Sequence, residues 1–219
     1  MKKVIIPIIF TIGLSWAFLA SAHQPRLVET GQIIIIKNPE VSQAFYGELR
    51  GSPQFFEIKT DRKISLYVGV LVPDLPGIKK DISAQVFSVG GEEIFVLDGL
   101  QGEWKVFFEE FAGDNYWQGP DKKMDVNPDT YRIKVYSPDN LGKYVLVVGE
   151  KESFPASEML KTLLTLPKLK KNFFNKSPLT AFFNLIGLYL LIALVIILLI
   201  GSLIILIIKK RIKNRKESK

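Results

Sequence analysis

Polar and apolar residues alternate along much of the chain between positions 32 and 149, which is the pattern of half-buried β-strands. The runs 64–72 (ISLYVGVLV) and 130–137 (TYRIKVYS) show it best, because every second side chain would fall on one apolar face. Gly90-Gly91 separates two such runs and is typical of a tight hairpin turn. Shorter runs of the same character are 32–37, 54–59, 82–89, 92–98, 103–108 and 143–149. About seven to nine short strands with no helical period between them predict an antiparallel β-sandwich.

A long apolar stretch follows these strands. Residues 179–208 contain no charged side chain over thirty consecutive positions. In lipid the backbone polar groups must be paired within the segment, and about 20 apolar residues in helical form cross the hydrocarbon core. The sequence therefore predicts one transmembrane helix over 179–208, with Ser177-Pro178 as its N-cap and first residue. The polar positions within it are Thr180, Asn184, Tyr189 and Ser202.

The two ends of the chain predict how it lies in the membrane. Residues 1–22 have a basic start, an apolar stretch of about fifteen residues and the small residues Ala20-Ser21-Ala22, which together indicate a cleaved signal peptide. An uncleaved anchor is the alternative, but the apolar stretch is short for a membrane span. The tail 209–219 has seven basic residues and one acidic residue. Cytoplasmic flanks are enriched in lysine and arginine, so we expect residues 23–178 outside the cytoplasm and the tail inside.

Charge is divided unevenly along the chain. The formal net charge of +7 arises at the membrane flanks, since residues 23–154 contain 15 basic and 20 acidic residues. Nucleic-acid binding requires a basic patch on the folded domain, so an acidic domain makes nucleic acid an unsuitable partner. Membrane lipid is a suitable one, and the basic residues expected to contact its headgroups after the span are Lys209, Lys210 and Arg211.

Between the strands and the span lies a basic amphipathic segment, residues 153–178. Leucines and phenylalanines recur in it at helical spacing beside lysines, and Pro167 is expected to divide it into two short helices. The apolar face has two possible partners. It can lie on lipid headgroups, which Lys168, Lys170 and Lys171 would contact, or it can pack under the sandwich as a stalk. Both alternatives bury the same leucines, so the sequence leaves them open.

Two strand pairs carry a resemblance to a known family. Residues 127–137 (NPDTYRIKVYS) followed by 142–149 (GKYVLVVG) resemble the closing hairpin of bacterial pre-peptidase C-terminal domains, and 46–49 with 55–58 resemble their opening strands. The match covers about 100 residues, and Asp129 stands where the family has a glycine. The resemblance implies a jelly-roll-like sandwich and a non-catalytic accessory domain at a cell surface, and it brings no active-site residues.

Catalytic chemistry has little to build on in this composition. The chain has no cysteine and a single histidine, His23, which would lie at the new N-terminus after cleavage. Ser-His-Asp and Cys-His nucleophiles, cysteine metal sites and disulfides are therefore excluded, and we expect no enzyme. An exported chain without disulfides favours a prokaryotic cell surface. The roughly 130 residues of 23–152 are enough for one hydrophobic core, so we expect this domain to fold on its own.

One stretch has an unusual local composition. Residues 109–129 mix carboxylates with aromatic rings around two glycines and are predicted to form a long loop between strands. Carboxylates suit calcium and an exposed ring suits a sugar or a peptide, although the spacing is not that of an EF-hand. In the alternative interpretation the loop is structural and Trp117 packs into the sandwich edge. The candidate ligand-binding residues are Asp114, Tyr116, Trp117 and Asp121, and the candidate calcium ligands are Asp114, Asp121 and Asp125.

Two classes of function fit these observations. In the first, the chain is a non-catalytic module anchored at the cell surface that binds a protein, glycan or envelope partner. In the second, it is an accessory subunit of a larger membrane complex, recognised through its transmembrane and juxtamembrane helices, where Asn184 or Gly201-Ser202 could make helix contacts.

Overall fold

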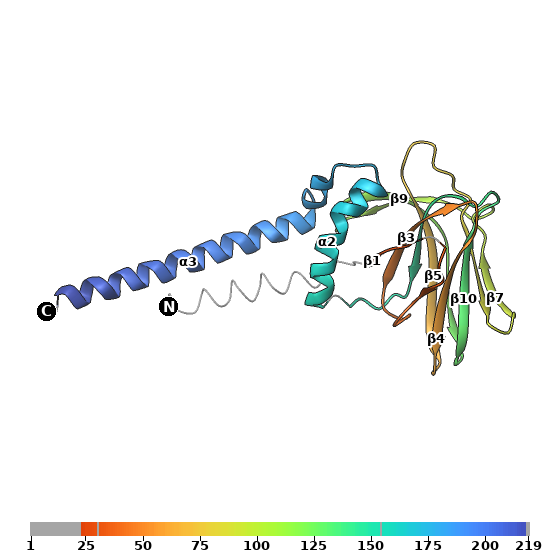
Figure 1. Ribbon diagram of the computed structural model, residues 1–219, viewed down its shortest axis with the longest axis horizontal. Coiled ribbons are helices and arrows are strands. Elements are labelled where there is room, and N and C mark those ends of the chain that lie inside the picture. The colour runs from red at the N-terminus through yellow and green to blue at the C-terminus, as the bar shows by residue number, and fades with distance from the viewer. Residues whose placement is uncertain (1–22, 30, 154, 218–219) are drawn as a thin grey trace.

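Figure 1 shows the computed structural model of the chain, which describes residues 23–217 apart from 30 and 154. Two β-sheets lie face to face, and helix α2 (Ala156–Asn172) covers the outer face of one sheet. Helix α3 (Leu185–Glu217) runs away from the sheets on the α2 side. The signal peptide expected over residues 1–22 lies outside the described residues.

The sheets have six and five strands, and together they are called the sandwich below. The six-stranded sheet has the order β1-β3-β11-β5-β9-β8, and the five-stranded sheet has the order β2-β4-β10-β6-β7. The strands of the first sheet are β1 (Gln24–Leu27), β3 (Gln43–Arg50), β11 (Leu141–Val148), β5 (Ile64–Pro73), β9 (Asp114–Val126) and β8 (Lys105–Glu109). Those of the second are β2 (Ile34–Ile35), β4 (Gln54–Thr60), β10 (Asp129–Tyr136), β6 (Ser83–Ser88) and β7 (Glu93–Leu97).

Both sheets are mixed, whereas the sequence predicted antiparallel ones. Strand β1 pairs parallel with β3, and β2 pairs parallel with β4. The chain alternates between the sheets from β1 to β4, so each return to a sheet places the new strand parallel to the earlier one. A period of two shows which face of a strand is buried but not the direction of its neighbour, which explains the difference.

The hydrophobic core lies between the sheets and confirms the predicted alternation. Ile64, Leu66 and Val68 of β5 face inward and are buried, as are Tyr131 and Ile133 of β10. The Gly90-Gly91 hairpin also forms, between β6 and β7, and Gly91 has a φ of +89°. Glycine adopts this left-handed conformation without steric cost.

The predicted loop over residues 109–129 is wrong. A short turn after β8 leads directly into β9, a strand of 13 residues that pairs with β8 on one side and with β5 on the other. Residues 121–125 are all exposed, so this half of the strand has no alternating burial. The sequence pattern failed here because the strand is held by two neighbours rather than by an apolar face.

A second apolar cluster decides between the two alternatives for the amphipathic segment. The outer face of the six-stranded sheet is apolar, and the apolar face of α2 packs on it. Leu166 and Leu169 are therefore buried against protein, whereas Leu160 and Leu164 of the same helix remain exposed. The buried members of this outer-face cluster are Ala44, Leu71, Tyr116, Val145, Val147, Leu166, Leu169, Phe173, Phe174, Ala181 and Ile186.

Helix α2 is continuous, so the expected division at Pro167 is wrong. The proline lacks the amide hydrogen that the carbonyl of Leu163 would accept within the helix. Its neighbours Leu166 and Leu169 are nevertheless buried in the outer-face cluster. Tertiary packing on both sides of the proline thus outweighs its local cost.

The long apolar helix begins later than predicted. Residues 178–182 form a short 3₁₀ helix, η2 (Pro178–Phe182), that packs on α2, and α3 starts at Leu185. Among the described residues, α3 holds one stretch that is long and apolar enough to cross a membrane, Leu185–Asn214. No residue of its most apolar window is buried, as expected of a lipid-facing helix.

Candidate functional site

Asp114 lies where the sandwich meets the helices, a contact called the junction below. It is the first residue of β9 and its side chain is 0% exposed. The preceding Gly113 has a φ of +71°, a conformation that favours glycine. The turn after β8 thereby places the Asp114 carboxylate on the outer face of the sheet, beneath the last turn of α2.

Two lysines pair with this carboxylate. Lys170 of α2, only 1% exposed, places its Nζ 2.6 Å from Oδ2 of Asp114 and also donates to the Ala112 carbonyl at 2.7 Å. Lys176 donates to the other oxygen, Oδ1, at 2.9 Å from a partly exposed position. A buried charge is tolerated only when it is paired and hydrogen-bonded, and this pair meets both conditions.

Asn184 connects the start of α3 to the same turn. Its Nδ2 donates to the carbonyls of Ala112 at 2.8 Å and Ala181 at 3.1 Å, and its Oδ1 accepts the amide of Gly187 at 3.2 Å. The last bond is a typical N-cap interaction. Asn184 was expected inside the transmembrane helix; it lies instead at the end of the sandwich and caps α3.

Aromatic rings surround the junction and limit water there. The hydroxyls of Tyr46 and Tyr116 lie 3.0 Å apart, and the rings of Phe173 and Phe174 pack on them edge to face. Burial raises the pKa of both tyrosines well above the usual value, so both stay neutral. Burial also raises the pKa of Glu109, although its carboxylate accepts two amide groups of the turn.

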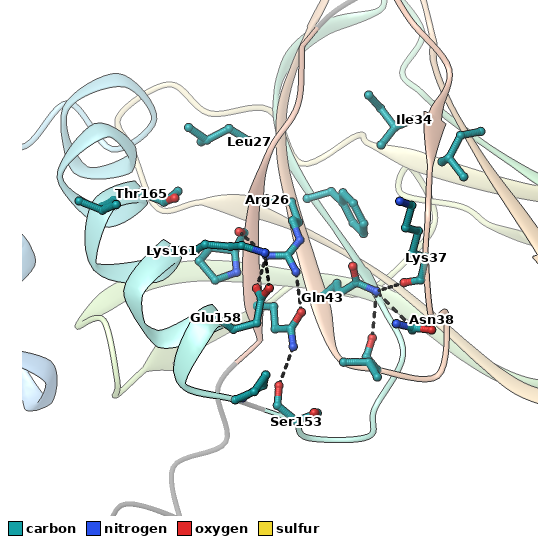
Figure 2. A pocket seen from close by; sticks show the side chains of 17 residues that line it. Arg26, Leu27, Ile34, Lys37, Asn38, Gln43, Ser153, Glu158, Lys161 and Thr165 are labelled. Atoms are coloured by element: carbon teal, nitrogen blue, oxygen red, sulfur yellow. Dashed lines mark hydrogen bonds and ion pairs between the residues drawn. The ribbon is translucent and has the colours of Figure 1, made fainter.

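A pocket of about 820 Å³ opens at the other end of α2 (Figure 2). Strands β1 and β2 are edge strands of the two sheets, and the pocket lies between them and the first half of α2. Figure 2 shows Arg26, Glu158 and Lys161 on one side and Ile34 and Lys37 on the other. The apolar lining residues at its rim are Leu27, Ile35 and Leu164.

Glu158 is the charged centre of this pocket. Arg26 of β1 lies 2.8 Å from its Oε2, and Lys161 donates to its Oε1 at 2.8 Å. Burial alone raises the pKa of Glu158, but the contacts with Lys161 and Arg26 outweigh it and lower the pKa. The carboxylate therefore stays ionised and holds both cations at the pocket wall.

The predicted calcium ligands do not come together. Asp114 is engaged by the two lysines, while Asp121 and Asp125 lie on the exposed half of β9. Asp125 pairs with Lys63 at 3.1 Å. Asp114 and Asp121 are seven positions apart on the extended strand, about 23 Å. No group of three or more metal-ligating acidic or histidine side chains forms within the part of the chain that the structure describes.

The predicted aromatic platform is occupied by protein groups. Tyr116 is buried in the outer-face cluster, so it cannot receive a ligand. Trp117 points to the inner side and packs partly on the core, and its Nε1 donates to Asp74 at 3.0 Å. The ammonium of Lys80 lies 3.6 Å from the centre of its ring. The structural interpretation of Trp117 therefore fits its surroundings better.

The six predicted membrane-contact residues lie in two helices, three in α2 and three in α3. Lys170 is buried against Asp114, so the expected headgroup contact is wrong for this residue. Lys168 and Lys171 are exposed beside it. The remaining three, Lys209, Lys210 and Arg211, are exposed near the far end of α3.

Sequence reasoning missed the pocket residues. Glu158 and Lys161 carry a local signal, because an acidic residue in the first turn and an i, i+3 pair are typical of helix starts. Arg26 has no such signal, since only the packing of α2 on β1 brings it to Glu158.

No protein-family model matches the chain, and no curated protein matches it. The pre-peptidase C-terminal domain of a collagenase from Bacillus anthracis is a distant structural match, with 11% identity and a TM-score of 0.36, covering 55% of this chain and 97% of that one. CorA, described as a surface-associated copper-binding protein important in copper acquisition by Methylomicrobium album BG8, matches with 9% identity and a TM-score of 0.29, covering 58% of this chain and 100% of that one.

Proposed function

We propose that this chain is a non-catalytic binding module, held at the cell surface by α3, with its sandwich outside the cytoplasm and its basic tail inside. Its sandwich would be a jelly-roll-like member of the pre-peptidase C-terminal group. The observation that carries this proposal is the pocket of about 820 Å³, to which the sandwich and α2 both contribute. Pockets of a few hundred Å³ or more with a few convergent polar groups are typical ligand sites.

The walls of the pocket indicate the chemistry of the partner. Arg26, Lys37 and Lys161 bring three positive charges to it, and Glu158 is the acidic residue among its lining residues. Leu27 and Leu164 add exposed apolar surface. An acidic peptide segment with apolar side chains would match both features, so we propose a protein partner of this kind.

Site-specific photocrosslinking in intact membranes tests the proposal. A benzophenone amino acid replaces Leu164, which is 66% exposed at the pocket, or Val89, which is 52% exposed at the distant β6–β7 hairpin and serves as the control. We expect a discrete protein adduct from position 164 that is absent from position 89. Lys37→Glu in the same chain should reduce the yield of the adduct about tenfold, because a negative charge in the pocket wall would repel an acidic partner.

The same experiment separates the second class of function. A benzophenone at Leu199, exposed on α3, reports on neighbours inside the membrane. Adducts from position 199 with none from position 164 would support an accessory subunit recognised through its helix and would contradict the pocket. An adduct from position 164 that Lys37→Glu leaves unchanged would contradict the acidic partner.

A further inference from the structure

Strand β8 leaves an apolar edge of the six-stranded sheet uncovered. It is the last strand in the order of that sheet and pairs only with β9 within the described strands. Val106 and Phe108 are 64% and 54% exposed. Val106 is paired with Trp117, whose ring packs on the core, so Val106 points to the inner side of the sheet. Phe108, two residues further along the strand, points to the same side. They are exposed because the five-stranded sheet does not cover them.

The other sheet edges differ from this one. On β7, the inward residues Phe95 and Leu97 are buried in the core. Strand β1 is covered by α2, and β2 is only two residues long. An exposed apolar edge strand is a template for pairing with another chain, and proteins normally cover or charge it. Edge β8 therefore combines free pairing groups with apolar side chains.

We propose that β8 pairs with β8 of a second copy of this chain, joining two six-stranded sheets into one across a twofold axis. The sequence of the strand, Lys105-Val106-Phe107-Phe108-Glu109, is complementary to itself when it runs antiparallel about Phe107. Val106 of each copy then lies opposite Phe108 of the other, and their apolar surfaces meet. Lys105 of each copy lies opposite Glu109, whose carboxylate also accepts the amides of Phe111 and Ala112, so opposite charges come near each other at both ends.

The position of α3 fits this symmetry. The twofold axis of an antiparallel strand pair stands perpendicular to the sheet, so each face of one copy continues into the same face of the other. In each copy, Asn184 donates to the Ala112 carbonyl in the turn after β8, and Ile186 packs in the outer-face cluster. Helix α3 therefore starts at the outer face of the six-stranded sheet and runs away from the sandwich (Figure 1). Both helices therefore extend from one face of the joined sheet, as two anchors in one membrane must.

Cysteine crosslinking tests the register, because the natural chain contains no cysteine. Val106→Cys and Phe108→Cys are made in separately tagged full-length chains and co-expressed in membranes, then oxidised with copper phenanthroline. Residues directly opposite across an antiparallel pair are about 4.5–5.5 Å apart, within disulfide range, whereas Val106 of one copy and Val106 of the other are offset by two residues and lie about 7–8 Å apart. We expect the mixed pair of variants to form the disulfide-linked dimer. Either variant expressed alone should form much less disulfide-linked dimer.

Val96→Cys is the matched control, since Val96 is exposed on β7, the edge of the other sheet. A mixed pair that crosslinks no better than Val96→Cys overturns the proposal. A product with the mass of a different protein shows that another partner occupies the edge, and this also overturns it. Equal crosslinking by Val106→Cys alone contradicts the register.

A second variant measures the association itself. Val106→Lys places like charges on both copies beside the shared edge, and an exposed position should tolerate it without unfolding. We expect sedimentation in detergent to show dimerisation about tenfold weaker, with an unchanged circular dichroism spectrum. Dimerisation equal to that of the natural chain would overturn the proposal.

Discussion

At the scale of single residues, a substitution of Asp114 is expected to have a large effect on stability. Asp114→Asn removes the negative charge and leaves Lys170, which is 1% exposed, without its ion-pair partner. Breaking one side of a buried pair costs about 3–5 kcal/mol. We expect this loss in the free energy of unfolding of the detergent-solubilised chain, measured by denaturant titration.

Two further variants test whether the loss comes from the buried charge. Lys176 is 41% exposed at its side chain, so Lys176→Ala should cost only about 0–1 kcal/mol. Combining Asp114→Asn with Lys170→Met removes both buried charges and should recover most of the stability. A double variant as unstable as Asp114→Asn alone would mean that hydrogen bonding, not charge pairing, decides the stability of the junction.

The ring and the hydroxyl of Tyr144 are expected to have opposite effects on the stability of the folded chain. The side chain is fully buried in the core, and its hydroxyl has no hydrogen-bond partner among the described residues. The Tyr144 ring fits here because residue 47 is glycine: a Cβ on residue 47 would clash with the Tyr144 hydroxyl oxygen. We expect Tyr144→Phe to keep or raise the melting temperature, and Tyr144→Ala to cost about 3–5 kcal/mol. A marked loss with Tyr144→Phe would reveal an essential hydroxyl contact.

At the scale of elements, α2 is part of the folded domain. It covers the apolar outer face of the six-stranded sheet, so the sequence-based limit of the domain at Glu152 leaves that face exposed. We expect a soluble fragment of residues 23–176 to be monodisperse with a cooperative melt. The fragment 23–152 should bind a hydrophobic dye and aggregate. Equal behaviour of the two fragments in light scattering would contradict a domain role for α2.

The start of α2 should make stability depend on pH. Arg26 and Lys161 lower the pKa of Glu158 in the folded chain, so the unfolded chain binds its proton first as the pH falls. The stabilisation is therefore complete above the ordinary glutamate pKa and is lost as the pH falls through the lower folded value, from about pH 5 downward. Melting curves should show Glu158→Gln less stable than the natural chain near pH 7, with the difference vanishing in acid. A difference that persists unchanged in acid would rule out this cause.

At the scale of the whole molecule, the direction of the chain in the membrane is open to a direct test. External protease added to intact cells or spheroplasts should digest residues 23–178 and protect the tail 209–219, because the basic flank favours the cytoplasm. Antibodies against a tag at each end report the two products by blotting. Loss of the tail with an intact sandwich would reverse the proposed orientation.

The sequence by itself determined the elements that depend on local pattern. Alternation located strands such as β5 and β10, and an uncharged run longer than a bilayer needs located α3, since both signals are properties of a single segment. The net charge of the tail and the absence of cysteine also follow from composition alone. The amphipathic pattern of α2 indicated an apolar face, but not that Leu166 and Leu169 would pack on the sheet while Leu160 and Leu164 stay exposed.

Tertiary structure decided everything that depends on a neighbour. The carboxylate of Asp114 was a plausible metal ligand in the sequence, and it became half of an ion pair because α2 brings Lys170 onto the same sheet face. The ion pair between Arg26 and Glu158 likewise forms only because α2 packs on β1. The parallel pairs of β1 and β2, and the exposure of β8, follow from strand order. A pattern in one segment fixes which face is apolar, whereas the partner of that face is chosen by the free energy of the whole packed chain.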